Sequence, residues 1–329
     1  MTHQVRIAGQ DIAFACADGE SLLDAAERAG WALPYSCRKG VCSSCEGGLV
    51  AGEATQRGGR IAGPRSGVLF CQARPCTDLE IAPKRIERRD PPARRRVDAF
   101  VFRLAHPTPD VTVLHLRYPP QHRVRFQAGQ YLQVLLDDGT RRNYSMAAGP
   151  QQTDGTTLHI RRIPGGRFSD TTLGALLPGS LVPIELPFGD FFWRDDEVRP
   201  PILLASGTGM APLAAMLDDL ARRQWTGPLP LYWGVRRAAD LYLGPAITRW
   251  QALLPGLRYT PVLSEPEPGW TGRIGLVHHA VLDDHQTLAG HVVYASGNPA
   301  MIAAARAGFT ARGLAEDAFR ADPFVESGG

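Results

Sequence analysis

Three cysteines lie close together near the start of the chain, in the stretch YSCRKGVCSSC. They are Cys37, Cys42 and Cys45, which form a C-x4-C-x2-C arrangement with glycine and serine between them. Three thiolates at this spacing can converge on one point, but a metal or iron–sulfur centre usually takes four ligands. The stretch therefore predicts a metallocentre whose fourth ligand is one of the two later cysteines, Cys71 or Cys76.

The C-x4-C-x2-C spacing is typical of plant-type [2Fe–2S] ferredoxins. Such a cluster needs a tight loop whose backbone N–H groups turn toward the sulfurs, and Gly40, Ser43 and Ser44 suit such a loop. A zinc site or unligated thiols are the alternatives. Structural zinc sites usually pair two C-x2-4-C units; Cys71 and Cys76 are separated by four residues, but their flanking residues do not resemble those of a zinc knuckle. Cys16 is interpreted as a small buried side chain in an N-terminal strand.

A second group of residues, Arg142, Tyr144 and Ser145, combines a guanidinium, an aromatic ring and a hydroxyl within four positions, in the pattern R-x-Y-S. In general, a planar guanidinium suits phosphate and an aromatic face can pack on a flat ring. Taken alone, these residues can also be an ordinary strand end. A second motif is the turn Gly207-Thr208-Gly209, which follows an apolar strand and precedes a predicted helix. G-x-G by itself means little.

The elements that must position these residues change in type along the chain. The N-terminal part predicts a β-hairpin and then a helix that begins at Ser21 and stops at Gly30. Residues 97–197 show strand-like alternation broken by glycine and proline, which indicates an antiparallel barrel or sandwich. Beyond that, short apolar strands alternate with helices such as 211–223 and 300–312, the pattern of a parallel sheet with crossover helices.

Composition excludes several classes of protein. The chain has no apolar run of about 18 residues and no secretory signal, and its six cysteines are too few for a disulfide scaffold. We therefore expect a cytoplasmic protein that does not bind membranes. The net charge of +3 arises from residues 83–96, which carry 7 basic and 2 acidic side chains. This segment is interpreted as a solvated linker rather than a nucleic-acid-binding tract, because no aromatic residues interleave with its arginines.

In combination, these motifs resemble those of the one-chain reductases of bacterial ring-hydroxylating (Rieske) oxygenases, above all the terephthalate-type dioxygenase reductases. The resemblance covers essentially the whole chain and implies a multidomain α+β and α/β protein. Its predicted parts are a plant-type [2Fe–2S] ferredoxin domain of β-grasp fold at 1–82, a basic linker at 83–96, an antiparallel β-barrel FAD domain at 97–197 and an α/β parallel-sheet nicotinamide domain at 198–329.

The resemblance also implies roles in binding FAD. It assigns Arg142 to the flavin pyrophosphate, Tyr144 to packing on the isoalloxazine ring and Ser145 to a hydrogen bond near flavin N5. Further residues assigned to the flavin and its diphosphate are His159, Arg161, Gly165, Gly166 and Ser169. For His159, a strand histidine with a satisfied hydrogen bond is the alternative.

In the nicotinamide domain, the turn resembles the G-T-G-x-A-P loop of the family, whose glycines let the nucleotide's pyrophosphate approach a helix N-terminus. The residues concerned are Gly207, Thr208, Gly209 and Pro212. Glu265 stands where NADPH enzymes place an arginine; a carboxylate repels a 2′-phosphate, so NADH is favoured. An ordinary acidic residue in a surface loop is the alternative for Glu265.

Two further positions are expected close to the reacting rings. The family's C-G-x-P-x-M stretch appears here with Ser296 and Gly297 at its start, so the usual cysteine beside the nicotinamide is a serine. Its hydroxyl can still form a hydrogen bond. Phe324, in a stretch that resembles the family's A-D-x-F, is expected near the flavin, with core packing as the alternative. We predict Ser145, Ser296 and Phe324 as the catalytic residues.

The choice of the fourth cluster ligand rests on context. Counting residues favours Cys76, because plant-type ferredoxins commonly have nearly thirty residues between the third and the fourth ligand. Cys76 lies 30 residues after Cys45, and Cys71 lies only 25 residues after it. Cys71, however, follows the apolar run Val68–Phe70 and begins "CQA", as the fourth ligand of the family does. We predict the ligands Cys37, Cys42, Cys45 and Cys71, with a few residues deleted from the glycine-rich loop 46–67 that separates Cys45 from Cys71.

These parts predict an NADH-dependent relay in which FAD takes a hydride and passes single electrons through the [2Fe–2S] cluster to a separate terminal oxygenase. The partner is expected to bind transiently, with Arg38 and Lys39 as candidate contacts. Two alternatives remain: the same relay serving a deoxysugar dehydrase, as in CDP-6-deoxy-3,4-glucoseen reductases, and a redox-sensing module that uses the cofactors without turnover.

Overall fold

The computed structural model describes residues 1–89 and 94–325. The chain forms two compact units, one before and one after the segment 90–93. The predicted linker 83–96 lies partly outside the described residues, and the predicted domain boundaries stay a prediction. In the described part of the chain, no helix is long and apolar enough to cross a membrane.

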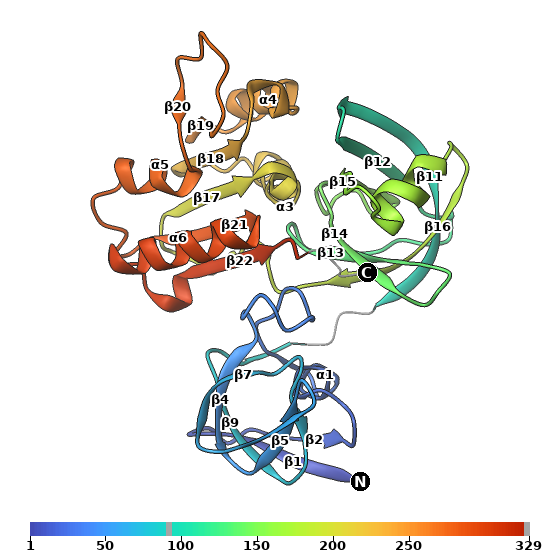
Figure 1. Cartoon of the computed structure of the whole chain (residues 1–329), viewed down its shortest axis with the longest axis vertical. Helices are drawn as coiled ribbons and strands as arrows, with labels where there is room; N and C mark the ends of the chain where they lie inside the picture. Colours follow the sequence, from blue (N-terminus) through green and yellow to red (C-terminus); the bar gives the residue numbers. More distant parts are fainter. Residues whose placement is uncertain (90–93, 326–329) are drawn as a thin grey trace. The chain divides into compact units, whose positions relative to one another are not determined.

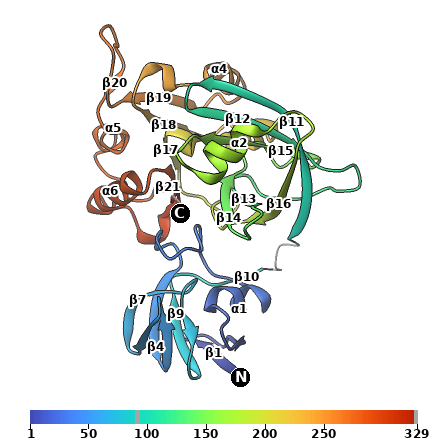
Figure 2. The same ribbon diagram turned by 45° about the vertical axis from the view of Figure 1, so that its right-hand side comes forward.

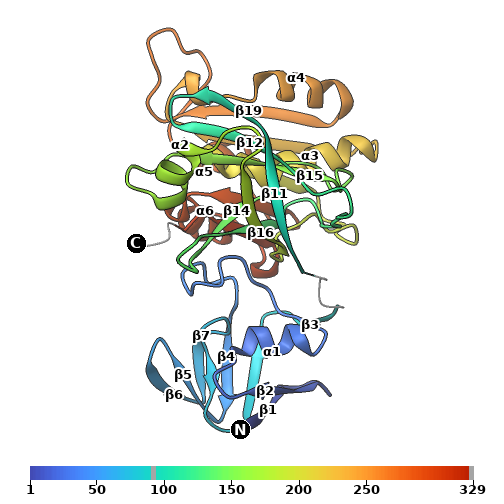
Figure 3. The ribbon, with the colours of Figure 1, turned by 90° about the vertical axis from the view of Figure 1, so that its right-hand side faces the viewer.

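The first unit holds a five-stranded mixed sheet that carries the helix α1, Leu22–Arg28 (Figures 1 and 3). The strand order is β2 (Ala13–Ala17), β1 (Thr2–Ile7), β9 (Leu79–Pro83), β4 (Glu46–Ala51) and β7 (Arg65–Leu69). β1 pairs antiparallel with β2 and parallel with β9, so this sheet has the mixed pairing of a β-grasp fold.

Helix α1 begins where the sequence indicates, because the Ser21 hydroxyl accepts a hydrogen bond from the Asp24 N–H. Its apolar face buries Leu22 and Leu23 completely. Smaller strands complete the unit: β3 (Trp31–Ala32), β5 (Glu53–Gln56), β6 (Gly59–Ala62), β8 (Arg74–Pro75) and β10 (Glu87–Arg88).

The second unit begins with an antiparallel barrel of six strands (Figure 2). Their order is β14 (Arg141–Ser145), β13 (Tyr131–Leu135), β16 (Leu181–Phe188), β11 (Arg95–Thr108), β12 (Val111–Arg117) and β15 (Gly155–Arg161). A bridge between Met146 and Leu158 joins the two end strands, so the alternation of the sequence has produced a closed barrel rather than a sandwich. A π-helical turn, η1 (Arg167–Thr172), and α2 (Leu173–Ala175) follow β15.

The rest of this unit is a parallel six-stranded sheet with helices on both faces (Figure 1). Its strands are β20 (Arg273–Ile274), β19 (Leu257–Leu263), β18 (Leu229–Val235), β17 (Pro201–Ser206), β21 (Val292–Gly297) and β22 (Phe319–Pro323). Its helices and helical turns are η2 (Gly207–Gly209), α3 (Met210–Arg222), η3 (Ala238–Asp240), α4 (Gly244–Leu253), α5 (Val277–Asp284), α6 (Pro299–Ala311) and η4 (Glu316–Ala318).

Two separate apolar cores lie on the two faces of this sheet. α3 and α4 pack on one face, where Leu213 and Trp250 are buried, and α5 and α6 pack on the other, where Val281 and Phe309 are buried. This layered arrangement places the carboxyl ends of β17, β18 and β21 at one edge, where parallel α/β sheets bind their ligands. The predicted helices 211–223 and 300–312 are confirmed within one residue at each end.

The arginines on either side of residues 90–93 form contacts within their own units. Arg88 lies over the Trp31 ring at 5.0 Å, and Arg89 pairs with Glu87. On the other side, Arg94 lies over the Phe188 ring at 4.4 Å. The charges of Arg88, Arg89 and Arg94 are therefore engaged in cation–π and ion-pair contacts.

Candidate functional site

The four predicted cluster ligands come together as two pairs in the first unit. Cys37, Cys42 and Cys45 lie in the loop between β3 and β4, and Cys71 lies just after β7. A hydrogen bond between the thiols of Cys37 and Cys42 lowers the pKa of Cys37 and raises the pKa of Cys42. In the second pair, a hydrogen bond between the thiols of Cys45 and Cys71 raises the pKa of Cys45 and lowers the pKa of Cys71.

This pairing suits a two-iron centre better than a single ion. In a [2Fe–2S] cluster, four thiolates are divided between two irons. The two thiol pairs fit this division of the ligands between two irons. Cys76 lies instead beside the sheet of β5, β6 and β8, where its N–H donates to the Glu53 carbonyl.

Backbone N–H groups of the loop turn toward the sulfurs, as a negatively charged cluster requires. The Lys39 N–H donates to Cys37 Sγ at 3.3 Å, and the Cys37 N–H donates to Cys42 Sγ at 3.4 Å. This turning needs left-handed backbone at Arg38 (φ 55°), Gly40 (φ 74°) and Ser43 (φ 54°). The strained conformation of the two non-glycine residues is typical of a functional loop.

Arg38 does not have the exposure that the sequence analysis expected of a contact for a partner protein. Its side chain is only 16% exposed and forms ion pairs with Asp24 and Glu27 of α1. Arg38 therefore ties the cysteine loop to the helix. Val41, the apolar residue in this loop, is 54% exposed.

In the second unit, Arg142, Tyr144 and Ser145 lie on β14, next to the bridge at which the barrel closes. The ring of Tyr144 packs against that of Phe168, with 5.4 Å between centroids. Arg142 lies two residues before Tyr144 on the same strand, and Ser145 is the last residue of β14. Because alternate residues of a strand point to the same face, Arg142 and Tyr144 lie on one face of β14, as a shared ligand requires.

The Gly165-Gly166 turn leads into η1 beside this strand. Gly165 has φ of +73°, and its N–H donates to Asp170 at 2.8 Å. A Cβ at Gly166 would lie 2.5 Å from Ser169 Oγ, so only glycine fits there. The Ser169 hydroxyl accepts from the Ile163 N–H at 3.3 Å. The turn has the glycine-rich backbone that suits a diphosphate.

The G-T-G turn lies at the carboxyl end of β17 and leads directly into α3. A Cβ at Gly209 would lie 2.3 Å from the Ser296 carbonyl oxygen, so glycine allows the turn to pack against the end of β21. Pro212 lies in the first turn of α3, where its missing N–H leaves no hydrogen bond unmade. The guanidinium of Arg161, from the barrel, lies about 3.5 Å from where a Cβ at Gly207 would stand. The barrel thus contributes a cation beside the G-T-G turn.

The predicted catalytic serines meet at Asp322, a residue that was not among the predicted site residues. Ser145 donates to the Asp322 carboxylate at 2.8 Å, and Ser296 donates to the Asp322 carbonyl at 3.3 Å. All three side chains are buried. Asp322 lies on β22, so this contact joins the barrel to the parallel sheet. The signal for it was its place in the A-D-P-F stretch, two residues before Phe324.

Phe324 and Glu265 lie at the same edge of the sheet. The Phe324 N–H donates to the Gly297 carbonyl at 2.8 Å, and its side chain is half-buried. Glu265 follows β19, and its N–H donates to the Arg236 carbonyl at 2.9 Å. Its exposed carboxylate lies 4.0 Å from the Arg236 guanidinium. The Glu265 carboxylate therefore faces solvent.

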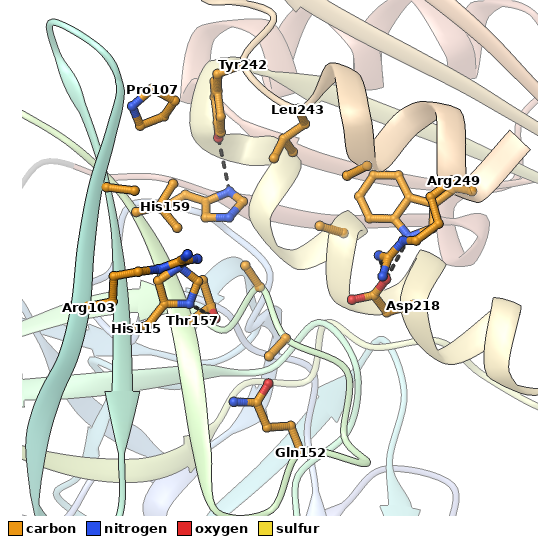
Figure 4. Close-up of a pocket in the computed structure, with 17 residues that line it drawn as sticks. Arg103, Pro107, His115, Gln152, Thr157, His159, Asp218, Tyr242, Leu243 and Arg249 are labelled. Atoms are coloured by element: carbon orange, nitrogen blue, oxygen red, sulfur yellow. Dashed lines mark hydrogen bonds and ion pairs between the residues drawn. The ribbon is translucent and has the colours of Figure 1, made fainter.

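His159 forms a contact between the barrel and the parallel-sheet part of the second unit (Figure 4). It is buried, and its Nδ1 lies 3.1 Å from the Tyr242 hydroxyl. Burial, with a smaller effect from His115, lowers the pKa of His159 to about 4. Both residues line a cavity of about 320 Å³, with Arg103, His115 and Arg249 also on its wall. Tyr242, which lies in the loop before α4, was not predicted, because only tertiary packing brings it to His159.

Comparison with known protein families assigns all three parts of the chain. The 2Fe-2S iron-sulfur cluster binding domain matches residues 5–76, the oxidoreductase FAD-binding domain matches 101–193, and the oxidoreductase NAD-binding domain matches 203–307. The chain is therefore an oxidoreductase with [2Fe–2S], FAD and NAD domains, and the predictions of fold class, enzyme and cofactors are confirmed.

Individual proteins are similar over nearly the full length. Reductase component 1 of terephthalate 1,2-dioxygenase from Comamonas sp. is 42% identical over 99% of this chain and 98% of its own. The CDP-6-deoxy-L-threo-D-glycero-4-hexulose-3-dehydrase reductase of Yersinia pseudotuberculosis is 33% identical over 99% of this chain and 100% of its own. Among solved structures, the Amycolatopsis cytochrome P450 reductase GcoB superimposes with a TM-score of 0.80 at 29% identity, covering 99% of both chains.

Proposed function

We propose that this chain, which belongs to the family of one-chain reductases that join a [2Fe–2S] domain to FAD and NAD domains, supplies electrons from NADH to a terminal Rieske-type oxygenase that hydroxylates an aromatic ring. The observation that carries this proposal is the 42% identity, from end to end, with a reductase component of a terephthalate dioxygenase. The complex with the oxygenase is proposed to be transient, as electron-transfer encounters generally are.

We propose that Cys37, Cys42, Cys45 and Cys71 hold the cluster. Support comes from their arrangement as two pairs and from the N–H groups directed at Cys37 and Cys42. Cys37, Cys45 and Cys71 are buried, so the loop excludes most water from the site. Hydrogen bonds and burial are the means by which a protein sets the potential of such a cluster.

On the barrel, the same reasoning gives roles around the flavin. Arg142 and the Gly165-Gly166 backbone are proposed to bind the diphosphate, and Tyr144 to pack on the ring. Arg161 and Ser169 are also proposed to bind the flavin or its diphosphate, and His159 is proposed to border this site. When bound, FAD accepts a hydride and gives up electrons one at a time, which connects a two-electron donor to a one-electron acceptor.

For the nicotinamide nucleotide, Gly207, Thr208 and Gly209 are proposed to bind the pyrophosphate at the N-terminus of α3, which Pro212 helps to begin. Gly297 is proposed to border the nucleotide beside them, and Glu265 to accept from a free ribose hydroxyl and so to favour NADH.

Three residues are proposed to act close to the reacting rings. Ser145 is proposed to lie beside the hydride acceptor; its single hydroxyl hydrogen is donated to the Asp322 carboxylate, which fixes the orientation of the hydroxyl oxygen. Ser296 orients the carboxyl end of β21 beside it through the Asp322 carbonyl. Phe324 covers the site from the chain's C-terminal strand. These residues bind and orient, and no proton-transfer step is needed from any of them.

The test is reduction of two acceptors by the reconstituted full chain. NADH should reduce cytochrome c through the protein, and a purified Rieske-type ring-hydroxylating oxygenase should form hydroxylated product only when the reductase is present. Cys45→Ser should retain reduction of the flavin by NADH but should not support the oxygenase, because the route through the cluster is lost. Absence of cytochrome c turnover would favour the redox-sensing module, and product formation at the wild-type rate by Cys45→Ser would contradict the route.

A second acceptor has its own support in the 33% identity, also from end to end, with a dehydrase reductase for a CDP-linked deoxysugar. The two candidates differ only in the partner, because the domains are the same. Presenting the reduced protein to an oxygenase and to a deoxysugar dehydrase in parallel, and comparing the rates of cluster reoxidation, separates them. Faster reoxidation by the dehydrase would overturn the oxygenase proposal.

A further inference from the structure

The side chain of Gln72 lies against the proposed cluster ligand that precedes it. Its amide nitrogen, Nε2, is 3.7 Å from Cys71 Sγ, within reach of a hydrogen bond to sulfur. The same nitrogen donates to the Cys71 carbonyl at 3.1 Å and to the Arg38 carbonyl at 3.2 Å. Gln72 therefore touches both the ligand and the loop that carries the other three cysteines.

The two carbonyl contacts determine which end of the amide faces the sulfur. Carbonyl oxygens only accept hydrogen bonds, so the group between the Arg38 and Cys71 carbonyls must be the NH2 and not the amide oxygen. An NH2 carries two hydrogens for these three acceptors. One hydrogen is directed at the Arg38 carbonyl, and the other is shared between the carbonyl and the sulfur of Cys71.

The loop is built around this side chain. Gly40 packs so closely on Gln72 that a Cβ at Gly40 would lie 2.7 Å from its Cγ. The Gly40 carbonyl in turn accepts from Arg57. Gln72 is thus held from two sides, by packing on Gly40 and by hydrogen bonds to the carbonyls, and a held donor keeps its direction when the charge of its neighbour changes.

We propose that Gln72 is a positioning residue that raises the reduction potential of the [2Fe–2S] cluster. Reduction adds one negative charge to the cluster and its thiolates, and an N–H directed at a thiolate sulfur stabilises the more negative state more strongly than the less negative one. Gln72 therefore favours acceptance of the electron from the flavin. This inference rests on the proposed ligand set, in which Cys71 binds the cluster.

The first test is Gln72→Met in the reconstituted full chain, which keeps an unbranched side chain of similar length but removes the donor. At a fixed potential, we expect the ratio of reduced to oxidised cluster to fall about tenfold, which is a shift of about 59 mV to more negative potential for a one-electron couple. Gln72→Glu should shift the cluster further in the same direction, because a carboxylate repels the added charge. Redox titration followed by electron paramagnetic resonance gives the cluster and flavin potentials separately, and the flavin potential should not move.

Gln56→Met is the matched control. Gln56 is also a half-buried glutamine of the first unit, but its amide oxygen accepts from the Leu69 N–H at 2.7 Å and serves the fold alone. This variant should lose stability without a change in cluster potential. A Gln72→Met potential equal to that of Gln56→Met, with iron and sulfide content intact, would overturn the inference.

Failure of the ligand set gives a different result from failure of the inference. If Cys71 is not a ligand, Cys71→Ser retains the cluster; if only the role of Gln72 is wrong, Cys71→Ser loses it while Gln72→Met leaves the potential unchanged. Should neither Gln72 variant retain a cluster, wild-type protein labelled with 15N in its glutamine amides decides. We expect pulsed electron paramagnetic resonance to show a nitrogen coupling from the Gln72 side chain to the cluster. Absence of this coupling would refute the contact.

Discussion

Replacing Asp322 with alanine tests whether the contact between the barrel and the parallel sheet orients the serine proposed to lie beside the hydride acceptor. The Ser145 hydroxyl donates to the Asp322 carboxylate at 2.8 Å, and both groups are buried. A hydrogen bond to a charged group contributes roughly 1.5–3 kcal/mol. If that whole contribution is expressed in the hydride-transfer step, Asp322→Ala slows reduction of the flavin by NADH roughly 10- to 150-fold.

The assay is stopped-flow measurement of flavin bleaching under anaerobic conditions with saturating NADH. Asp322→Asn is the matched variant, because its amide oxygen still accepts from Ser145 while the charge is lost, and we expect a smaller effect. The double variant with Ser145→Ala should be no slower than Ser145→Ala alone, since the two residues act as one unit. Rate effects that multiply independently would refute the reasoning, as would an unchanged rate in Asp322→Ala with bound flavin.

Three further predictions concern the ligands, the interdomain histidine and the nucleotide. Cys71→Ser should abolish the visible absorption of the cluster, while Cys76→Ser retains it; the reverse result, read from iron content, would reassign the ligand. His159 has a pKa of about 4 in the folded protein against an ordinary 6.5, so the unfolded chain binds more protons between these values, and stability should decline by roughly 3 kcal/mol as pH falls through this window. His159→Phe should remove that part of the decline in urea unfolding at pH 7 and pH 5, and an unchanged slope would contradict the burial argument. Glu265→Ala should raise the ratio of kcat/KM for NADPH to that for NADH by about tenfold, because the repulsion of a 2′-phosphate is lost; an unchanged ratio would make Glu265 an ordinary surface acid.

The two halves of the second unit differ in how completely the periodicity of their apolar residues predicts their structure. The alternation in 97–197 is compatible with a barrel or a sandwich, since both need one apolar face per strand. Only the pairing of Met146 with Leu158 closes the sheet. By contrast, the helices around Leu213 and Phe309 were predictable to within a residue, because their apolar spacing and their glycine and proline boundaries are local signals.

Residue types likewise identified the chemistry but not the contacts. The spacing of Cys37, Cys42 and Cys45 indicates a cluster because the three thiolates must reach one centre from a single loop, a requirement that local sequence meets. The roles of Gln72 and Asp322 depend on partners 34 and 177 residues away. No local pattern encodes such a partner.

The sequence by itself therefore determined the cofactors and the order of the domains, since their binding motifs are short and contiguous. The tertiary structure alone decided that the four cysteines form two pairs, that Arg38 is held by α1 and that Ser145 and Ser296 share Asp322. The physical reason is that buried charged and polar groups need partners, and folding brings those partners from distant strands.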